Sequence, residues 1–363
     1  PGVQASTSQT AASEDPQGSN RKVVNGQSFA GTTQLLDGTD NRSVLLSLIV
    51  INPTLESVTE AKITTANYDA EFGVASAGVV SAQTKSGTNQ LHGSLFEFLR
   101  NGNMNARNAF ATKRDTLKRN QFGGTLGGPV KKDKIFFFVG YQGTKTRSDP
   151  ADRTGFVPST QMLTGDFSGC STFPANIIDP TTGQAFPGKK IPVSRFSPQA
   201  LAIVKFLPAS STSCGNVPFG PVQKINEYQT LGRVDYQINN KHSLFGKYMA
   251  TTYLLPPAYG FSKNILDSPT GGLDDLAQTI TLGDTYLFTP TVVNSFRLAM
   301  NRVGVQRFND DYFSGCDLGV NIYCYVPHQT VVNVTGGFNI GVGTAIQATF
   351  IPTYLTLSDD ISV

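Results

Sequence analysis

Hydrophobic and polar residues alternate along several segments of the chain after residue 90. In the clearest segment, residues 227–238, one set of alternate positions holds Tyr228, Thr230, Gly232, Val234, Tyr236 and Ile238, and the other holds Glu227, Gln229, Leu231, Arg233, Asp235 and Gln237. Successive side chains of a strand point to opposite faces, so this pattern predicts a strand with one apolar and one polar face. Residues 292–302 repeat it, with Phe296, Leu298 and Met300 opposite Ser295, Arg297, Ala299 and Asn301.

Weaker alternation predicts six more strands, and the connections between the strands fall into two classes. The further strands are residues 91–100, 119–130, 135–145, 243–253, 278–288 and 353–363. Short turns (131–134, 239–242, 289–291) alternate with long connections (101–118, 147–226, 256–275, 305–352). A transmembrane β-barrel has this asymmetry, with short periplasmic turns and long extracellular loops. Backbone polar groups in lipid must all be paired, which forces tight hairpins on one side only. The fold class expected is therefore mainly β, an antiparallel transmembrane β-barrel.

A soluble β-sandwich is the alternative architecture, since its strands alternate as well. It does not explain why long loops gather at one end, or why Phe and Tyr lie near strand ends as in an aromatic girdle. Charged residues make up only 15% of the chain, and it contains 36 Gly and 24 Phe. This composition favours strands and turns over helices.

The charge balance and the apolar runs exclude other classes. The formal net charge is +3 with no basic stripe, so no nucleic-acid partner is expected. No run of about 18 apolar residues is present, so no transmembrane helix is predicted.

The four cysteines, Cys170, Cys214, Cys316 and Cys324, all fall in the long connections. None forms a CxxC pair and no histidine is close to them in sequence, which argues against zinc. Pairing in chain order, 170 with 214 and 316 with 324, would close one loop each and indicate an oxidising compartment. Free thiols are the alternative.

The region before residue 90 has a different pattern. Residues 1–30 are rich in Ser, Thr, Gln, Gly and Asn and are expected to be irregular. Residues 31–90 predict a small α/β unit: a strand at Leu35–Leu36 that runs into a tight turn, a short helical segment after Pro53, and strands at 62–65 and 78–84.

Several motifs occur in a fixed order from residue 35 to residue 145. They are Leu36-Asp37-Gly38-Thr39-Asp40-Asn41; residues 53–60 followed by Ala70-Glu71-Phe72-Gly73; Gly78-Val79-Val80; Thr84-Lys85-Ser86-Gly87-Thr88-Asn89; His92-Gly93-Ser94; and Phe122-Gly123-Gly124 with Gly127-Gly128-Pro129 and residues 135–138. Together they resemble the TonB-dependent receptors, in the Oar-like branch with a carboxypeptidase-regulatory-like N-terminal domain. Further similarity at 179–183, 233–236 and 288–290 extends the resemblance over most of the chain after residue 30.

The resemblance implies an outer-membrane barrel of about 22 strands with a plugged lumen. Residues 1–90 would be the C-terminal part of the plug domain, and residues 91–363 the first eight or so barrel strands with their long extracellular loops. The chain opens at Pro1 without a signal peptide or a TonB-contacting segment and ends at Val363 without a terminal aromatic residue. We therefore expect a fragment of a longer protein, located in the bacterial outer membrane.

The resemblance also assigns candidate site residues. The plug motif comprises Asp37, Gly38, Asp40, Asn41, Glu71 and Gly73, and the plug-barrel junction comprises Lys85, Ser86, Gly87, Asn89, His92 and Gly93. Glu97 and Arg100 are candidate lumen contacts to the plug, with a generic polar inner face as the alternative. The expected partners are outer-membrane lipid, the TonB energising complex and an unidentified extracellular ligand.

No catalytic, cofactor or metal site is predicted. The three histidines are scattered without a nucleophile at a suitable spacing. The glycines at 123–128 lack the Lys-Ser/Thr of a phosphate loop and precede Pro129, so we interpret them as sites of sheet curvature.

Three functions compete. The first is active transport of a large solute through a plugged barrel. The second is a non-transporting barrel or adhesin that binds ligands with its loops, including an eight-stranded closed barrel in which 353–363 pairs with 91–100. The third is a secreted carbohydrate-binding sandwich.

Overall fold

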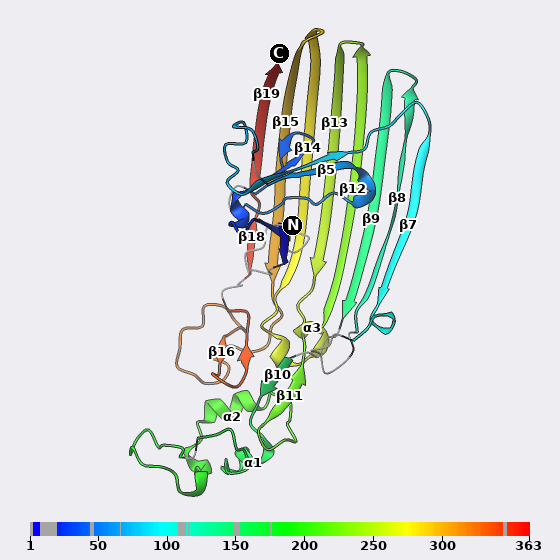
Figure 1. The fold of residues 1–363 in the computed structure, drawn as a ribbon. Coiled ribbons are helices and arrows are strands. Elements are labelled where there is room, and N and C mark those ends of the chain that lie inside the picture. The colour runs from blue at the N-terminus through cyan, green and yellow to red at the C-terminus, as the bar shows by residue number, and fades with distance from the viewer. Residues whose placement is uncertain are drawn as a thin grey trace.

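A nine-stranded antiparallel sheet, the large sheet, dominates the molecule (Figure 1). The computed structural model describes residues 3–7, 20–43, 47–65, 67–107, 114, 116–148, 153–174, 176–343 and 347–363. The large sheet consists of β7 (His92–Asn101), β8 (Lys118–Lys131), β9 (Ile135–Ser148), β12 (Gln223–Asn239), β13 (His242–Leu255), β14 (Gly272–Thr289), β15 (Val292–Phe308), β18 (Ala348–Phe350) and β19 (Thr353–Ser362). The strands from β7 to β15 pair in chain order, and β18 and β19 both pair with β15.

All eight predicted barrel strands are present, and the short and long connections alternate as expected. Five strands are longer than predicted at their loop ends by two or more residues; β14, for example, begins at Gly272 rather than at residue 278. Polar side chains break the alternation there, although the backbone ladder continues. Strand β19 pairs with β15, and the described part of β7 pairs with β8 alone, so the closed eight-stranded alternative is wrong.

The two faces of the large sheet differ as the sequence pattern predicts. Residues paired across an antiparallel ladder share a face. One face, here called the inner face, packs against the N-terminal elements and carries Leu231, Lys247, Met249 and Ala299, all of them buried. The opposite or outer face exposes a band of large apolar side chains, namely Leu95, Leu126, Val139, Tyr141, Val234, Tyr236, Ile280, Leu282, Leu355, Leu357 and Ile361. Such an outer face suits contact with lipid.

A four-stranded N-terminal sheet covers part of the inner face. Its order is β4 (Thr39–Asp40), β3 (Thr32–Leu36), β6 (Gly78–Thr84), β5 (Val58–Thr64), with β3 parallel to β6 and the other pairs antiparallel. Leu36, Val50 and Ile51 of this region share one buried cluster with Phe138, Leu231, Met249 and Val303 of the large sheet. Burial of apolar surface therefore holds the two sheets together.

Two expectations for the N-terminal region need correction. Residues 1–30 are not wholly irregular, because β1 (Val3–Thr7) and β2 (Asn20–Val24) form an antiparallel pair and η1 (Phe29–Gly31) follows. The segment after Pro53 is a single 3-10 turn, η2 (Leu55–Ser57), which leads into β5 four residues before the predicted strand. A strand with mostly exposed side chains gives little hydrophobic alternation, which explains the late predicted start.

The long connections build a separate unit at the far ends of the strands (Figure 1). The connection from β9 to β12 contains β10 (Arg153–Phe156), α1 (Thr160–Leu163), η4 (Pro187–Lys189), η5 (Val193–Arg195), α2 (Pro198–Val204) and β11 (Asn216–Phe219). The connection after β13 adds α3 (Tyr259–Ser262) and η6 (Ile265–Asp267), and the one after β15 adds β16 (Val332–Asn333) and β17 (Asn339–Ile340). Val157, Ile265, Leu266, Phe313 and Ile340 form the buried core of this unit, here called the loop module. The long connection from β7 to β8 carries η3 (Gly102–Met104).

Candidate functional site

A two-residue turn brings a carboxylate to the contact between the two sheets. Asp37 and Gly38 connect β3 to β4, and both have positive φ, at 51° and 82°. This is the backbone of a type I′ hairpin turn, for which Asp-Gly is a preferred sequence. The Asp37 carboxylate accepts hydrogen bonds from the Thr84 backbone N–H (2.8 Å) and the Thr84 hydroxyl (2.9 Å) at the end of β6. The turn and β6 therefore fix its position.

Two cations of the large sheet meet this carboxylate. Lys247 of β13 is fully buried and donates its ammonium to Asp37 Oδ2. Arg233 of β12 approaches Asp37 Oδ1 at 3.4 Å, donates to the Thr84 hydroxyl at 3.1 Å and pairs with Asp235 on its own strand at 2.7 Å. We call Asp37, Thr84, Arg233, Asp235 and Lys247 the ionic cluster. It joins the N-terminal sheet to the inner face.

The cluster is balanced so that Asp37 stays ionised. Burial alone would raise the pKa of the Asp37 carboxyl. Attraction to Lys247, hydrogen bonds from Lys247 and from the Thr84 backbone, and attraction to Arg233 outweigh that effect and hold the pKa below its ordinary value of 3.8. The Arg233 guanidinium also lies over the Phe245 ring, 4.4 Å from its centroid, and Arg297 of β15 flanks the same ring at 5.3 Å.

On both sides of the cluster, hydrogen bonds between uncharged groups also join the N-terminal region to the large sheet. Gln229 of β12 donates to the Asn52 carbonyl at 2.8 Å, and Asn301 of β15 donates to the Asp40 carbonyl at 2.8 Å. Ser43 and Tyr354 of β19 share a hydrogen bond at 3.2 Å. The N-terminal sheet is thus tied to strands from β12 to β19 by polar groups that surround the shared apolar core.

The predicted plug motif divides into residues that organise the contact and residues that do not. Asn41 bridges to Ile51 through its side-chain amide, which donates to the Ile51 carbonyl (2.7 Å) and accepts from the Ile51 N–H (3.2 Å). Asp40 pairs with Arg42 within the N-terminal region at 2.9 Å. Glu71 and Gly73 are both exposed and lie in the connection between β5 and β6. Their functional role stays a prediction.

The junction residues attach the chain to the first hairpin of the large sheet. Lys85 donates its backbone N–H to the Ser57 carbonyl (2.8 Å). Asn89 exchanges two hydrogen bonds with Asp133 in the β8–β9 turn, at 2.7 and 2.8 Å. A Cβ at Gly87 would lie 2.2 Å from the Phe137 carbonyl oxygen, and one at Gly93 would lie 2.5 Å from the Thr125 carbonyl oxygen. These close approaches require glycine at both positions.

Four further junction and strand positions have clear places. Ser86 precedes Gly87 in the same connection, and the His92 ring contacts the Gln90 carbonyl and the Thr88 hydroxyl. Glu97 pairs with Phe122 and therefore lies on the outer face, so the expectation that it contacts the lumen is wrong. Arg100 pairs with Arg119, and both belong to the set of alternate positions on the inner face. Both side chains are exposed. The alternation predicted two faces for β7, but not which of them the N-terminal sheet would cover.

The loop module carries both predicted disulfides. Cys170 is bonded to Cys214 and Cys316 to Cys324, which confirms pairing in chain order. Asp179 accepts two hydrogen bonds from the Arg195 guanidinium, at 2.9 and 3.1 Å. Hydrogen bonds from the Thr181 N–H and hydroxyl, and then from Arg195, lower the pKa of Asp179 to about 2. The module is thus held by covalent and ionic links as well as by its core.

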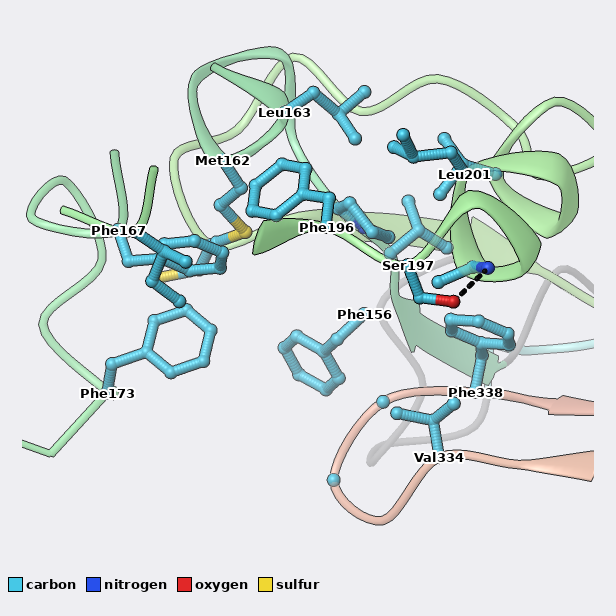
Figure 2. A pocket seen from close by; sticks show the side chains of 18 of the residues that line it. Phe156, Met162, Leu163, Phe167, Phe173, Phe196, Ser197, Leu201, Val334 and Phe338 are labelled. Carbon is cyan, nitrogen blue, oxygen red and sulfur yellow. Dashed lines mark hydrogen bonds between the residues drawn. The ribbon is translucent and has the colours of Figure 1, made fainter. Parts of the chain in front are cut away.

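An apolar pocket of about 500 Å³ opens in this module (Figure 2). Figure 2 shows Phe156, Phe196 and Phe338 pointing into it from three separate segments, with Met162 and Leu201 beside them. Ser197 caps α2 by accepting from the Ala200 N–H at 3.4 Å, which fixes the wall that carries Leu201. The volume suits a small organic molecule or an apolar side chain.

The sequence did not single out the cations of the ionic cluster or the pocket. The cluster cations Arg233 and Lys247, and Arg297 beside them, lie on the face of the strands that becomes covered. A charged residue that has to be buried needs a partner, and this was the signal available in the sequence. The pocket joins residues from two connections more than a hundred positions apart, for which local pattern carries no signal.

Among the residues that the structure describes, no group of three or more His, Cys, Asp or Glu side chains is placed to hold a metal ion. In the same part of the chain, no helix has the length and apolar character needed to cross a membrane.

Comparisons with known proteins agree with the fold. Residues 83–363 match the family model described as "Outer membrane beta barrel domain". TonB-dependent transporter Oar of Myxococcus xanthus is 31% identical over 132 residues, which is 34% of this chain and 12% of that protein. The ferric enterobactin receptor PfeA of Pseudomonas aeruginosa superposes over 99% of this chain and 42% of its own, with TM-scores of 0.53 for the R480A mutant with enterobactin and 0.51 for a double mutant, at 12% and 14% identity.

The chain therefore spans about two fifths of the length of these receptor structures and a smaller share of Oar. The likeness to PfeA bears on the fold, and the similarity to Oar confirms the resemblance inferred from the ordered motifs. The chain belongs to the outer-membrane β-barrel family, is related to the TonB-dependent receptors and is located in the bacterial outer membrane.

Proposed function

We propose that this chain contributes a plug segment, residues 32–84, and the first barrel strands to a protein that moves a solute across the outer membrane. The ionic cluster is the observation that carries the proposal. A permanent seal needs only apolar packing, whereas this contact places a buried Asp37–Lys247 pair at its centre. In this contact the buried pair would specify position more than it adds net stability, because removing two charges from water offsets much of their attraction.

Such a contact suits a plug that must hold one position and then leave it. The cluster, the Gln229–Asn52 bond and the Asn301–Asp40 bond each consist of groups that water can solvate once they separate. Apolar groups exposed by the same movement would remain costly, and they are concentrated in one small cluster around Leu36 and Val50. Pulling on the plug from the periplasmic side by the TonB energising complex would then break a limited set of interactions.

The loop module is the proposed first contact for the solute. Its pocket is lined by five phenylalanines and lies at the extracellular end, where a solute would approach from outside. A solute with an apolar portion would bury that portion there before it reaches the inner face. No covalent step is required, so no residue is assigned a catalytic role.

Conductance in planar bilayers tests the proposal. The full-length protein is expected to conduct weakly, because residues 32–84 fill the lumen. A variant of the full-length protein that lacks residues 32–84 is expected to form a large, permanently open pore. Equal conductance of the two proteins would contradict the assignment of a plug.

The alternative function is adhesion by a non-transporting barrel. Tyr323 and Tyr325, beside the second disulfide, are 87% and 80% exposed, which suits contact with a surface. Phe313 in the same loop is buried in the module core and cannot take this role. Weak conductance of both proteins, together with loss of surface attachment after Tyr323→Ser and Tyr325→Ser, would favour adhesion.

A further inference from the structure

Three cations form a row across neighbouring strands at the loop end of the outer face. The register pairs Lys118 of β8 with Arg147 of β9, and Arg147 with Lys224 of β12. Adjacent strands are about 4.8 Å apart, so the three backbone positions span only about 10 Å. The row follows the same alternation as Phe122 and Tyr228, which both pair with Gly143 on the outer face. It therefore points away from the lumen.

Like charges directly opposite each other destabilise a sheet. Within the described residues, none of the three cations forms an ion pair with a carboxylate. Arg147 instead donates to the Ile225 carbonyl (2.8 Å) and the Asn226 side chain (2.7 Å), and the Lys224 ammonium lies 3.6 Å from the Phe261 ring centroid. These neutral groups orient the charges without cancelling them.

The neighbouring sequence contains too few acidic residues to neutralise the positive charge of the row and of the basic residues around it. Residues 100–120 contain six basic residues and one acidic residue, Asp115, which lies outside the described residues, as do Asp149 and Asp152. A cavity of about 530 Å³ opens beside the row, and its described lining includes Arg114, Asn101 and Gln223 in addition to the three cations. No carboxylate is among these lining residues, so the cavity is suited to an anion.

The height of the row in the barrel determines which kind of anion it can bind. From Lys131 at the periplasmic turn to Lys118, a strand rises about 44 Å, or about 34 Å along the membrane normal at a tilt of about 40°. The apolar band of such a barrel is about 25 Å tall. The row therefore lies just beyond the band, at the level of lipid headgroups in the outer leaflet, and the aromatic side chains of Phe122 and Tyr228 lie below it toward the band.

We propose that Lys118, Arg147 and Lys224 bind the phosphate groups of an anionic lipid headgroup in the outer leaflet. Phosphate oxygens accept several charge-assisted hydrogen bonds at once, and a guanidinium flanked by two ammonium groups offers them. A bound headgroup removes the repulsion within the row and fixes the depth of β8, β9 and β12 in the membrane. The site is separate from the ionic cluster and from the pocket of the loop module.

Binding of bisphosphorylated lipid A to the full-length protein in detergent tests the proposal, measured by native mass spectrometry. The variant Lys118→Gln/Lys224→Gln is expected to weaken binding about 30-fold, because each cation near an anionic surface contributes roughly a fivefold factor. Arg147 is kept because it also bridges two strands. The control Lys131→Gln/Lys132→Gln removes the same charge from the exposed periplasmic end of the same hairpin and is expected to bind as the native protein does.

Three results would overturn the proposal. One is equal weakening in the two variants, which would mean unspecific attraction. Another is equal binding of dephosphorylated lipid A by the native protein. The third is tighter binding of inorganic pyrophosphate than of lipid A to the native protein, with loss of pyrophosphate binding in Lys118→Gln/Lys224→Gln. That result would assign the row to a soluble anion. A heat-modifiable band in electrophoresis shows that each variant retains a folded barrel, whatever its conductance.

Discussion

Replacing Asp37 by asparagine tests the ionic cluster directly. The substitution keeps the shape of the turn but leaves the buried Lys247 ammonium and the Arg233 guanidinium without the carboxylate that joins them to the N-terminal sheet. Removing one partner of a buried ion pair typically costs about 3–5 kcal/mol. The side chains of Asp37 and Lys247 are 4% and 0% exposed, so this range for buried pairs applies. Asp37→Asn is expected to loosen the N-terminal sheet while the large sheet stays folded.

Hydrogen exchange of the full-length protein in detergent measures the effect. Amides of β3 and β6 are expected to exchange one hundred to a few thousand times faster in Asp37→Asn, since each 1.4 kcal/mol is a factor of ten. Asp40→Asn is the matched control, because Asp40 lies outside the ionic cluster, is partly exposed and pairs with Arg42 of its own region. Since the Arg42 side chain is only 8% exposed, the expected cost is about 1–3 kcal/mol, below that of Asp37→Asn.

A second substitution separates the loss of an interaction from the cost of an unpaired charge. Adding Lys247→Met to Asp37→Asn removes the buried ammonium as well and is expected to restore much of the protection, since replacing both partners of a buried pair is often neutral. Equal exchange in Asp37→Asn and Asp40→Asn, with no recovery in the double variant, would refute the reasoning. Because the folded pKa of Asp37 lies below 3.8, its stabilisation is complete at neutral pH and is lost as the pH falls below about 4 through the folded pKa.

Three other predictions concern the junction and the loop module. Gly87→Ala places a Cβ 2.2 Å from the Phe137 carbonyl oxygen, so we expect less folded barrel by heat-modifiability. Gly232→Ala is the control for loss of a glycine, because a Cβ there meets no atom within 4 Å and its φ is not positive. Cys170→Ser/Cys214→Ser opens a 44-residue loop and is expected to destabilise the loop module by about 4 kcal/mol, seen as faster proteolysis between these positions with the large sheet intact; unchanged cleavage would refute it. Asp179 has a pKa of about 2, below its ordinary value, so the Arg195 pair should hold from pH 7 to pH 4 and be lost only as the pH falls toward 2. Exchange of residues 176–186, corrected for intrinsic rates, checks this, and loss of protection already at pH 5 would contradict it.

The sequence predicted the large sheet well because its strands obey a strict local rule. In β12 and β15 every second residue faces lipid or the lumen, so the two sets of side chains separate visibly, and the turns follow from tight hairpins. The disulfides were predictable for a similar reason, since each closes a segment within one connection. The wrong face assigned to Glu97 shows the limit, because alternation fixes which residues share a face but not which face the N-terminal sheet covers.

The contacts of the candidate site could not be predicted from the sequence, because they join residues that are far apart in the chain. Asp37 was identified from its turn motif, but its partners Arg233 and Lys247 lie 196 and 210 residues away. The late prediction of β5 has a different cause, since its mostly exposed residues lack an alternating pattern. Resemblance to known receptors supplied the plug motif and the junction, whereas the cationic row on the outer face required the register of three strands.

A cysteine pair between the two sheets tests the central claim, that residues 32–84 lie against the inner face of the barrel. A Cβ at Gly140 of β9 would lie 2.9 Å from the Ser57 hydroxyl oxygen, close enough for a disulfide after Ser57→Cys and Gly140→Cys. The measurement is the cross-linked fraction of the full-length variant in outer-membrane vesicles, with each single variant as a control. Near-complete cross-linking of the double variant is the result predicted. Free thiols at both positions in a folded, heat-modifiable barrel would contradict the plugged arrangement.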